Sequence, residues 1–103
     1  MNIKELSSNE IMPGFHGRII HGSDFTWVYW EIDKGASLPQ HNHVNEQLMY
    51  VIEGKFEFTF EGKINICTKG STFFIPSNVP HSGRAITKCK IIDVFSPKRD
   101  DIG

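Results

Sequence analysis

The sequence has few cysteines, no long apolar run and no excess of charge of either sign. Its two cysteines, Cys67 and Cys89, do not belong to a CxxC pair, and we expect both to be reduced, half-buried thiols. No apolar stretch approaches the ~18 residues that a membrane-spanning helix requires. Residues 1–10 contain no apolar signal-peptide core. These absences predict a cytoplasmic protein that does not bind a membrane.

The charge balance excludes a further class of partner. The 103 residues carry 11 Lys and Arg against 12 Asp and Glu, which gives a formal net charge of −1. Proteins that bind nucleic acid generally need a basic patch, so we do not expect a nucleic-acid partner. Hydrophobic residues make up 39% of the chain, which is typical of a globular domain and too many for a disordered one. The core of so short a chain must be small, and oligomerisation would help to stabilise it.

Helical periodicity is also absent, and short runs of strand-forming residues separated by turn signals take its place. These runs predict strands at residues 15–21, 26–33, 47–52, 56–61, 64–68, 72–75, 81–86 and 89–95, with residues 37–43 leading into a further strand. Many short strands in a small chain predict an all-β sandwich or barrel. We divide the chain into an N-terminal arm (1–14), one barrel domain (15–97) and a polar C-terminal tail (98–103).

His41 and His43 form an HxH pair, which is a candidate metal-binding motif. On a strand, residues two positions apart point to the same face, so both imidazoles can reach one point. If the strand continues, Gln47 shares this face and can offer its amide oxygen. Glu46 is chemically the better ligand, but it would reach the site only through a bulge or a turn near residues 44–45. The alternation favours Gln47 and leaves Glu46 as the alternative.

A third histidine, His81, follows Pro76 and Pro80 at the start of a predicted strand. In a small barrel this strand could lie beside the histidine pair. Three neutral imidazoles and one oxygen ligand suit a single divalent ion of Ni, Fe, Mn, Zn or Cu, and these ligand types do not choose among the five metals.

Two segments around these residues resemble the two sequence motifs of the cupin superfamily. The first is Gly35, five residues, His41-Asn42-His43, three residues, Gln47, six residues and Gly54. The second is Gly70, five residues and Pro76-Ser77-Asn78-Val79-Pro80-His81. The resemblance implies a small antiparallel β-barrel or jelly roll with a metal at its centre, commonly a homodimer. Where the family usually has Glu, this chain has Gln47, which would leave the metal site one charge more positive.

The C-terminal part narrows the resemblance to one kind of cupin. Residues 92–101, together with residues 42–54 and 56–60, are similar to small bacterial cupins of pectin and alginate breakdown. Those proteins convert 4,5-unsaturated uronate monosaccharides, the products of polysaccharide lyases, to their open-chain keto form. The resemblance implies metal ligation by His41, His43, Gln47 and His81, and active-site roles for Asp93, Phe95 and Arg99.

The implied substrate is a small anionic sugar, and each of the last three residues has a chemical task that suits it. Arg99 can bind the carboxylate bidentately. Asp93, held in an apolar barrel, could have a raised pKa and act as a general acid or base. Phe95 would form a platform for the sugar ring.

Two other functions remain open at this point, because the cupin fold supports many chemistries. One is a different metal-dependent cupin enzyme, such as a dioxygenase or a sugar isomerase. The other is a non-catalytic module that binds a sugar or a metal. In the expected homodimer, residues 1–14 could add a strand to a neighbouring subunit and cover an exposed edge.

Overall fold

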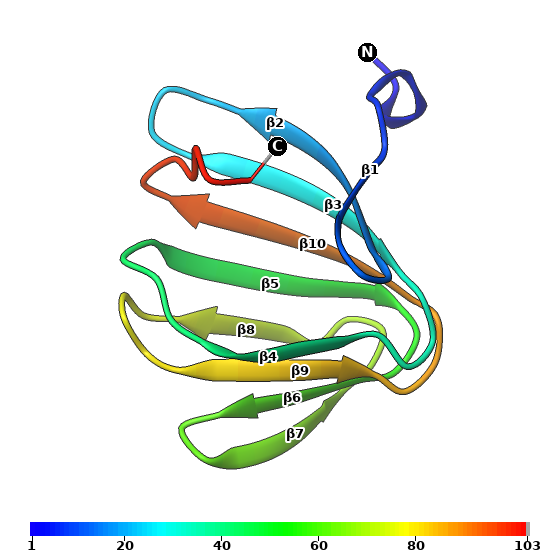
Figure 1. Ribbon diagram of the computed structural model, residues 1–103, viewed down its shortest axis with the longest axis vertical. Coiled ribbons are helices and arrows are strands. Elements are labelled where there is room, and N and C mark those ends of the chain that lie inside the picture. Colours follow the sequence, from blue (N-terminus) through cyan, green and yellow to red (C-terminus); the bar gives the residue numbers. More distant parts are fainter. Residues whose placement is uncertain (103) are drawn as a thin grey trace.

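The computed structural model describes residues 1–102, and these form two antiparallel sheets that enclose a common core (Figure 1). The elements are a short 3-10 helix (Ile3–Glu5) and the strands β1 (Asn9–Met12), β2 (Phe15–His21), β3 (Thr26–Ile32), β4 (Ser37–His41), β5 (Glu46–Glu53), β6 (Phe56–Phe60), β7 (Lys63–Cys67), β8 (Thr72–Ile75), β9 (His81–Ala85) and β10 (Cys89–Ser96). The all-β prediction is confirmed. The helical part of residues 1–102 is too short to cross a membrane.

The two sheets bring distant parts of the chain together. The larger sheet has the strand order β1-β2-β3-β10-β5-β8, and the smaller one has the order β4-β9-β6-β7. β10, near the C-terminus, therefore lies between β3 and β5 in the middle of the larger sheet. Inward-facing side chains of these three strands, among them Val28, Val51 and Ile91, belong to one buried core.

Alternating burial along the strands explains why these residues form this core. In β3, every second side chain from Thr26 to Ile32 is buried, and the side chains between them are partly exposed. β10 repeats this pattern from Cys89 onward. In β6, Phe56 and Phe58 are buried and Phe60 packs against the core, as the alternation of the three phenylalanines predicts.

Two turns contain a residue with a positive φ angle, which few residue types adopt easily. Asn78 has a φ of 64°, the left-handed conformation that Asn tolerates better than most residues. Gly54 has a φ of 95°, and a Cβ atom there would collide with the carbonyl oxygen of Lys88. Only glycine fits at position 54, so the turn between β5 and β6 can pass close to the start of β10.

Segments near both ends of the described chain contact the two sheets. Residues 9–12, which we assigned to the N-terminal arm, form the edge strand β1, and this strand pairs with β2 of the same chain. The pattern did not predict β1, because Asn9 and Glu10 are exposed and the strand is short and irregular. At the other end, Ile102 is only 8% exposed and joins the core.

Candidate functional site

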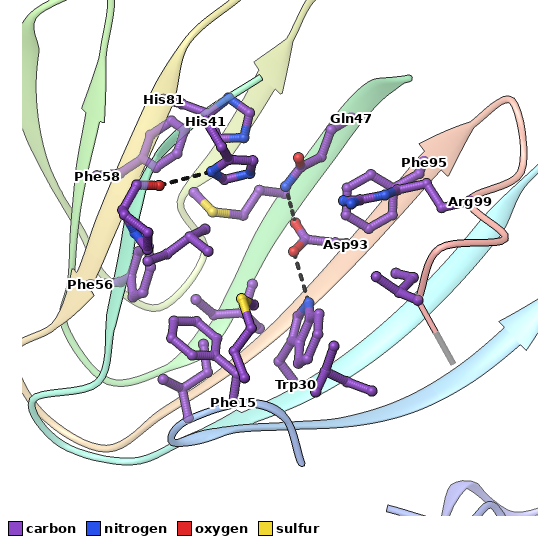
Figure 2. Close-up of a pocket in the computed structure, with 18 of the residues that line it drawn as sticks. Phe15, Trp30, His41, Gln47, Phe56, Phe58, His81, Asp93, Phe95 and Arg99 are labelled. Atoms are coloured by element: carbon purple, nitrogen blue, oxygen red, sulfur yellow. Dashed lines mark hydrogen bonds between the residues drawn. The ribbon is translucent and has the colours of Figure 1, made fainter. Parts of the chain in front are cut away.

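A cavity of about 400 Å³ lies between the two sheets (Figure 2). Its size falls within the range of about 300–1,000 Å³ that is typical of small-molecule sites. Apolar side chains from β1, β2, β3 and β6 line one end of it, among them Phe15 and Phe56. Its polar residues are His41, Gln47, His81, Asp93, Arg99 and Asp101. An otherwise apolar cavity thus holds a small set of convergent polar groups.

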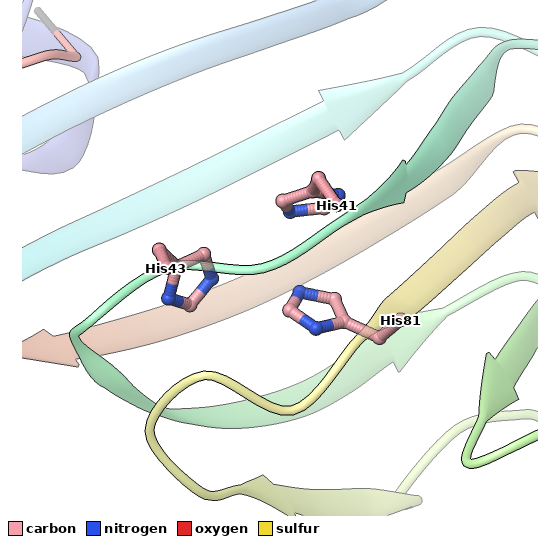
Figure 3. Close-up of side chains that lie close together, drawn as sticks. All are labelled: His41, His43 and His81. Atoms are coloured by element: carbon pink, nitrogen blue, oxygen red, sulfur yellow. The ribbon is translucent and has the colours of Figure 1, made fainter.

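The three histidines meet beside this cavity (Figure 3). His41 ends β4 and lies directly opposite His81, the first residue of β9. His43 lies in the connection after β4, so it reaches the cluster from a turn and not from the strand that we expected. The ring centroids are 4.3 Å apart for His41 and His81 and 5.1 Å apart for His43 and His81. One potential ligand atom from each ring lies within 4.8 Å of those of the other two.

Hydrogen bonds to the backbone fix the orientation of all three rings. Each Nδ1 atom lies near a main-chain carbonyl oxygen, at 3.0 Å for His41 and Pro39, 2.8 Å for His43 and Asn45, and 2.9 Å for His81 and Val79. A carbonyl oxygen can only accept, so each Nδ1 carries the proton and each Nε2 keeps a free lone pair. A neutral imidazole whose Nδ1–H is held by a carbonyl oxygen can bind a metal ion through its free Nε2.

His81 carries the clearest sign that a ligand is needed. Its Nε2 atom is buried and has no hydrogen-bond partner among the described residues. Burial lowers the pKa of His81 to about 4 and lowers that of His43 as well, so both rings are neutral near pH 7. Because leaving a buried polar atom unpaired is costly, an orphaned Nε2 that faces two other imidazoles fits a metal ion.

Gln47 brings an amide oxygen close to the histidine cluster. It is 7% exposed and faces inward from β5, whereas Glu46 is exposed. Its Nε2 donates to Asp93 Oδ1 at 2.8 Å, which turns the amide oxygen toward the histidines. That oxygen, Oε1, lies 3.2 Å from Nε2 of His43. The alternation along β5 therefore gave the correct inward residue, and three nitrogens and one oxygen converge on one region.

Asp93 links this cluster to the other wall of the cavity (Figure 2). Its Oδ2 accepts a hydrogen bond from the indole Nε1 of Trp30 at 2.9 Å, while Oδ1 accepts from Gln47. Burial raises the pKa of Asp93 to about 6, although both hydrogen bonds and the charge of Arg99 act in the opposite direction. Trp30 was not among the predicted site residues. A tryptophan in an apolar strand usually needs an acceptor for its indole N–H, and this requirement could have indicated a polar partner nearby.

Phe95 and Arg99 contact each other in the lining of the cavity. Phe95 is buried, its ring lies edge-on to that of His43 at 5.6 Å, and the Arg99 guanidinium lies over it at 4.8 Å. The Arg99 backbone N–H donates to Thr26 Oγ1 at 2.8 Å. Arg99 is therefore held against the barrel, and its side chain is only 15% exposed. Sequence reasoning missed Asp101, whose carboxylate pairs with this guanidinium.

Comparison with known proteins agrees with this architecture. The family model described as "Cupin domain" matches residues 28–95. Pectin degradation protein KdgF of Dickeya dadantii (strain 3937) is 34% identical in an alignment of 95 positions that covers 89% of this chain and 86% of that protein.

Two solved structures are similar in both sequence and shape. The structure of KdgF from Halomonas sp. matches with a TM-score of 0.89 and 33% identity, over 95% of this chain and 92% of that one. An RmlC-like cupin from Shewanella frigidimarina NCIMB 400 matches with a TM-score of 0.91 and 32% identity, over 95% and 89% of the two chains. The double-sheet fold, the family match and these relatives together show that this chain belongs to the cupin domain family.

Proposed function

We propose that this chain is a metal-dependent enzyme of pectin degradation that converts 4,5-unsaturated uronate monosaccharides to their open-chain keto form. The observation that carries the proposal is the convergence of three histidines and Gln47 beside a cavity that also contains Asp93 and Arg99. The similarity to a protein named for pectin degradation supports the choice of substrate class.

The proposed ligands of one divalent ion are Nε2 of His41, His43 and His81 and Oε1 of Gln47. All four donors are neutral, so they would leave the full positive charge of the ion at the site. Such an ion supplies a Lewis acid that attracts substrate oxygens and stabilises negative charge that develops on them. Imidazole and amide donors suit Ni, Fe, Mn, Zn and Cu alike.

Arg99 and Phe95 would place the substrate in the cavity. The guanidinium of Arg99 offers the paired N–H groups that a carboxylate binds best. Phe95 lies directly beneath it and next to His43, so a sugar held by Arg99 would lie near the histidine cluster. The mostly apolar lining of the cavity would strengthen the pairing of opposite charges.

Asp93 is the candidate for moving the proton. Ring opening transfers a proton from the C1 hydroxyl to C4 while the bond between C1 and the ring oxygen breaks, which leaves an aldehyde at C1 and a ketone at C5. The reaction is an isomerisation, so one group that accepts a proton and returns it is sufficient. A pKa of about 6 allows Asp93 to be populated in both forms near neutral pH.

The direct test mixes the metal-loaded protein with unsaturated uronate monomers made by a polysaccharide lyase. We expect the ultraviolet absorbance of the conjugated C4=C5 double bond to fall much faster than it does spontaneously. Asp93→Asn is the matched variant, because it keeps the shape of the side chain and removes its ability to carry the proton. A decay rate that the protein does not change would refute the proposed activity.

A homodimer also stays a prediction, and one surface supports it. Leu48 on β5 pairs with Phe74 on β8, and with Tyr50 they form an apolar patch on the outer face of the larger sheet. These side chains are 50%, 54% and 42% exposed. Clustered apolar groups on a surface often mark a contact with another chain. Light scattering after size-exclusion chromatography tests this, and a monomer at all concentrations would contradict it.

A further inference from the structure

Arg99 is already paired with a carboxylate of its own chain. Its Nη2 lies 2.7 Å from Asp101 Oδ2, and its Nε donates to Asp101 Oδ1 at 3.2 Å. This two-point arrangement is the fork geometry with which arginine binds carboxylate ligands. Asp101 therefore occupies the guanidinium edge that a bidentate anionic ligand would use.

The pair lies at the solvent-exposed edge of the cavity. Arg99, Asp101 and the neighbouring Ile102 all line the cavity. The side chain of Arg99 is 15% exposed, whereas that of Asp101 is 65% exposed, so the carboxylate meets solvent on its outer side. Ile102 is buried and anchors the segment. The hydrogen bond from Arg99 also lowers the pKa of Asp101, which keeps this group ionised at neutral pH.

Arg99 does not depend on Asp101 alone for its position. Its guanidinium lies over the Phe95 ring, and its backbone N–H is bonded to Thr26. These contacts would remain if the Asp101 carboxylate were removed. An incoming anion must therefore displace Asp101 or bind beside a second negative charge, and like charges at such a distance repel each other.

We propose that Asp101 is a specificity-determining residue, an internal carboxylate that competes with anionic ligands for the guanidinium of Arg99. The inference rests on the proposed function to the extent that Arg99 receives the carboxylate of the substrate. It goes beyond that function because it assigns a basis for selectivity among anions. An anion that contacts Arg99 alone would not displace Asp101, whereas a uronate that also reaches the histidine cluster would.

The test is calorimetric titration of the metal-loaded protein with D-galacturonate, a stable saturated uronate, and with neutral D-galactose. We expect Asp101→Asn to bind galacturonate about fivefold more tightly than the unchanged protein, a factor typical of the loss of one partly exposed ion pair. The affinity for galactose should not change. Asp101→Glu should restore the weaker binding, because it restores the competing carboxylate.

Asp100→Asn is the matched control, since it removes an equal charge one residue away. Asp100 is 83% exposed and pairs with Lys98 at 3.3 Å, away from Arg99. If Asp101→Asn binds galacturonate no more tightly than Asp100→Asn does, or does not bind it at all, the competition is overturned. Turnover of unsaturated uronates is measured separately: tighter galacturonate binding without turnover would overturn the proposed function and leave the competition intact.

Discussion

Nε2 of His43 lies 3.2 Å from Oε1 of Gln47, and neither atom has a proton to offer the other. The His43 proton is on Nδ1, bonded to the carbonyl oxygen of Asn45, and the Gln47 amide nitrogen is turned toward Asp93. Two acceptors at this distance repel each other unless a positive charge lies near both. The amide orientation that Asp93 imposes thus favours the metal binding that we propose for this site.

Removal of a cluster histidine should remove the metal. We expect His81→Ala and His41→Ala to lose bound metal, because each deletes one of four proposed donors. Elemental analysis of protein purified without a histidine tag measures this. His16→Ala is the control, since His16 pairs with Asp33 on the surface and lies outside the cluster. Unchanged metal content in both cluster variants would mean that the ion binds elsewhere.

Gln47→Glu should separate metal binding from catalysis. The variant keeps an oxygen donor, so metal content should persist. It also places a second carboxylate where the amide nitrogen now donates to Asp93, and the repulsion would hold a proton on one of the two groups. We expect turnover to fall by about two orders of magnitude, the scale of a lost acid–base group. Turnover at the original rate would show that Asp93 does not need the Gln47 hydrogen bond.

Trp30→Phe should destabilise the barrel through one lost hydrogen bond. The phenyl ring keeps most of the apolar contact, but Asp93 Oδ2 loses its only side-chain donor in the described chain. We expect the free energy of unfolding to fall by about 1–3 kcal/mol, measured by urea denaturation. Trp27→Phe, on the partly exposed face of the same strand, is the control and should change stability less. If both variants lost the same free energy of unfolding, the loss would come from the smaller ring and not from the hydrogen bond.

Protonation of His81 should lower the free energy of unfolding of the metal-free protein at acidic pH. Its pKa is about 4 in the folded state against 6.5 for an unperturbed histidine, so the unfolded chain takes up the proton first. Stability from this group is therefore complete above about pH 6.5 and is lost as the pH falls through about 4. The pH titration of the His81 ring signal by NMR checks this, and a midpoint near 6.5 would contradict it.

Much of this site could be predicted because its residues depend on local alternation. The inward side of β5 follows from strand periodicity, which correctly predicted that Gln47 faces inward and Glu46 does not. That Gln47 is a metal ligand stays a prediction. The same rule placed Asp93 and Phe95 on one buried face of β10. His41 and His43 were expected together on one strand, and they do lie together, although His43 reaches the cluster from the turn after β4.

The missed features depend on contacts between distant or irregular segments. Trp30 reaches Asp93 across 63 residues of sequence, which follows only from the placement of β10 beside β3. Asp101 lies in a charged stretch of a kind that is usually solvated, and the pairing with Arg99 and the burial of Ile102 hold it at the cavity. β1 is a short edge strand whose pattern contains too few residues to show a period.

The carbonyl groups that hold the three histidine rings have a consequence for how the site tolerates sequence change. They belong to the backbone of Pro39, Asn45 and Val79, so no side-chain substitution at these positions removes the acceptors themselves. A carboxylate in the same role could be lost by a single mutation. The backbone fold itself thus sets the orientation of the rings, and a substitution at Pro39 or Val79 that keeps the backbone in place would leave the rings pointing at one another.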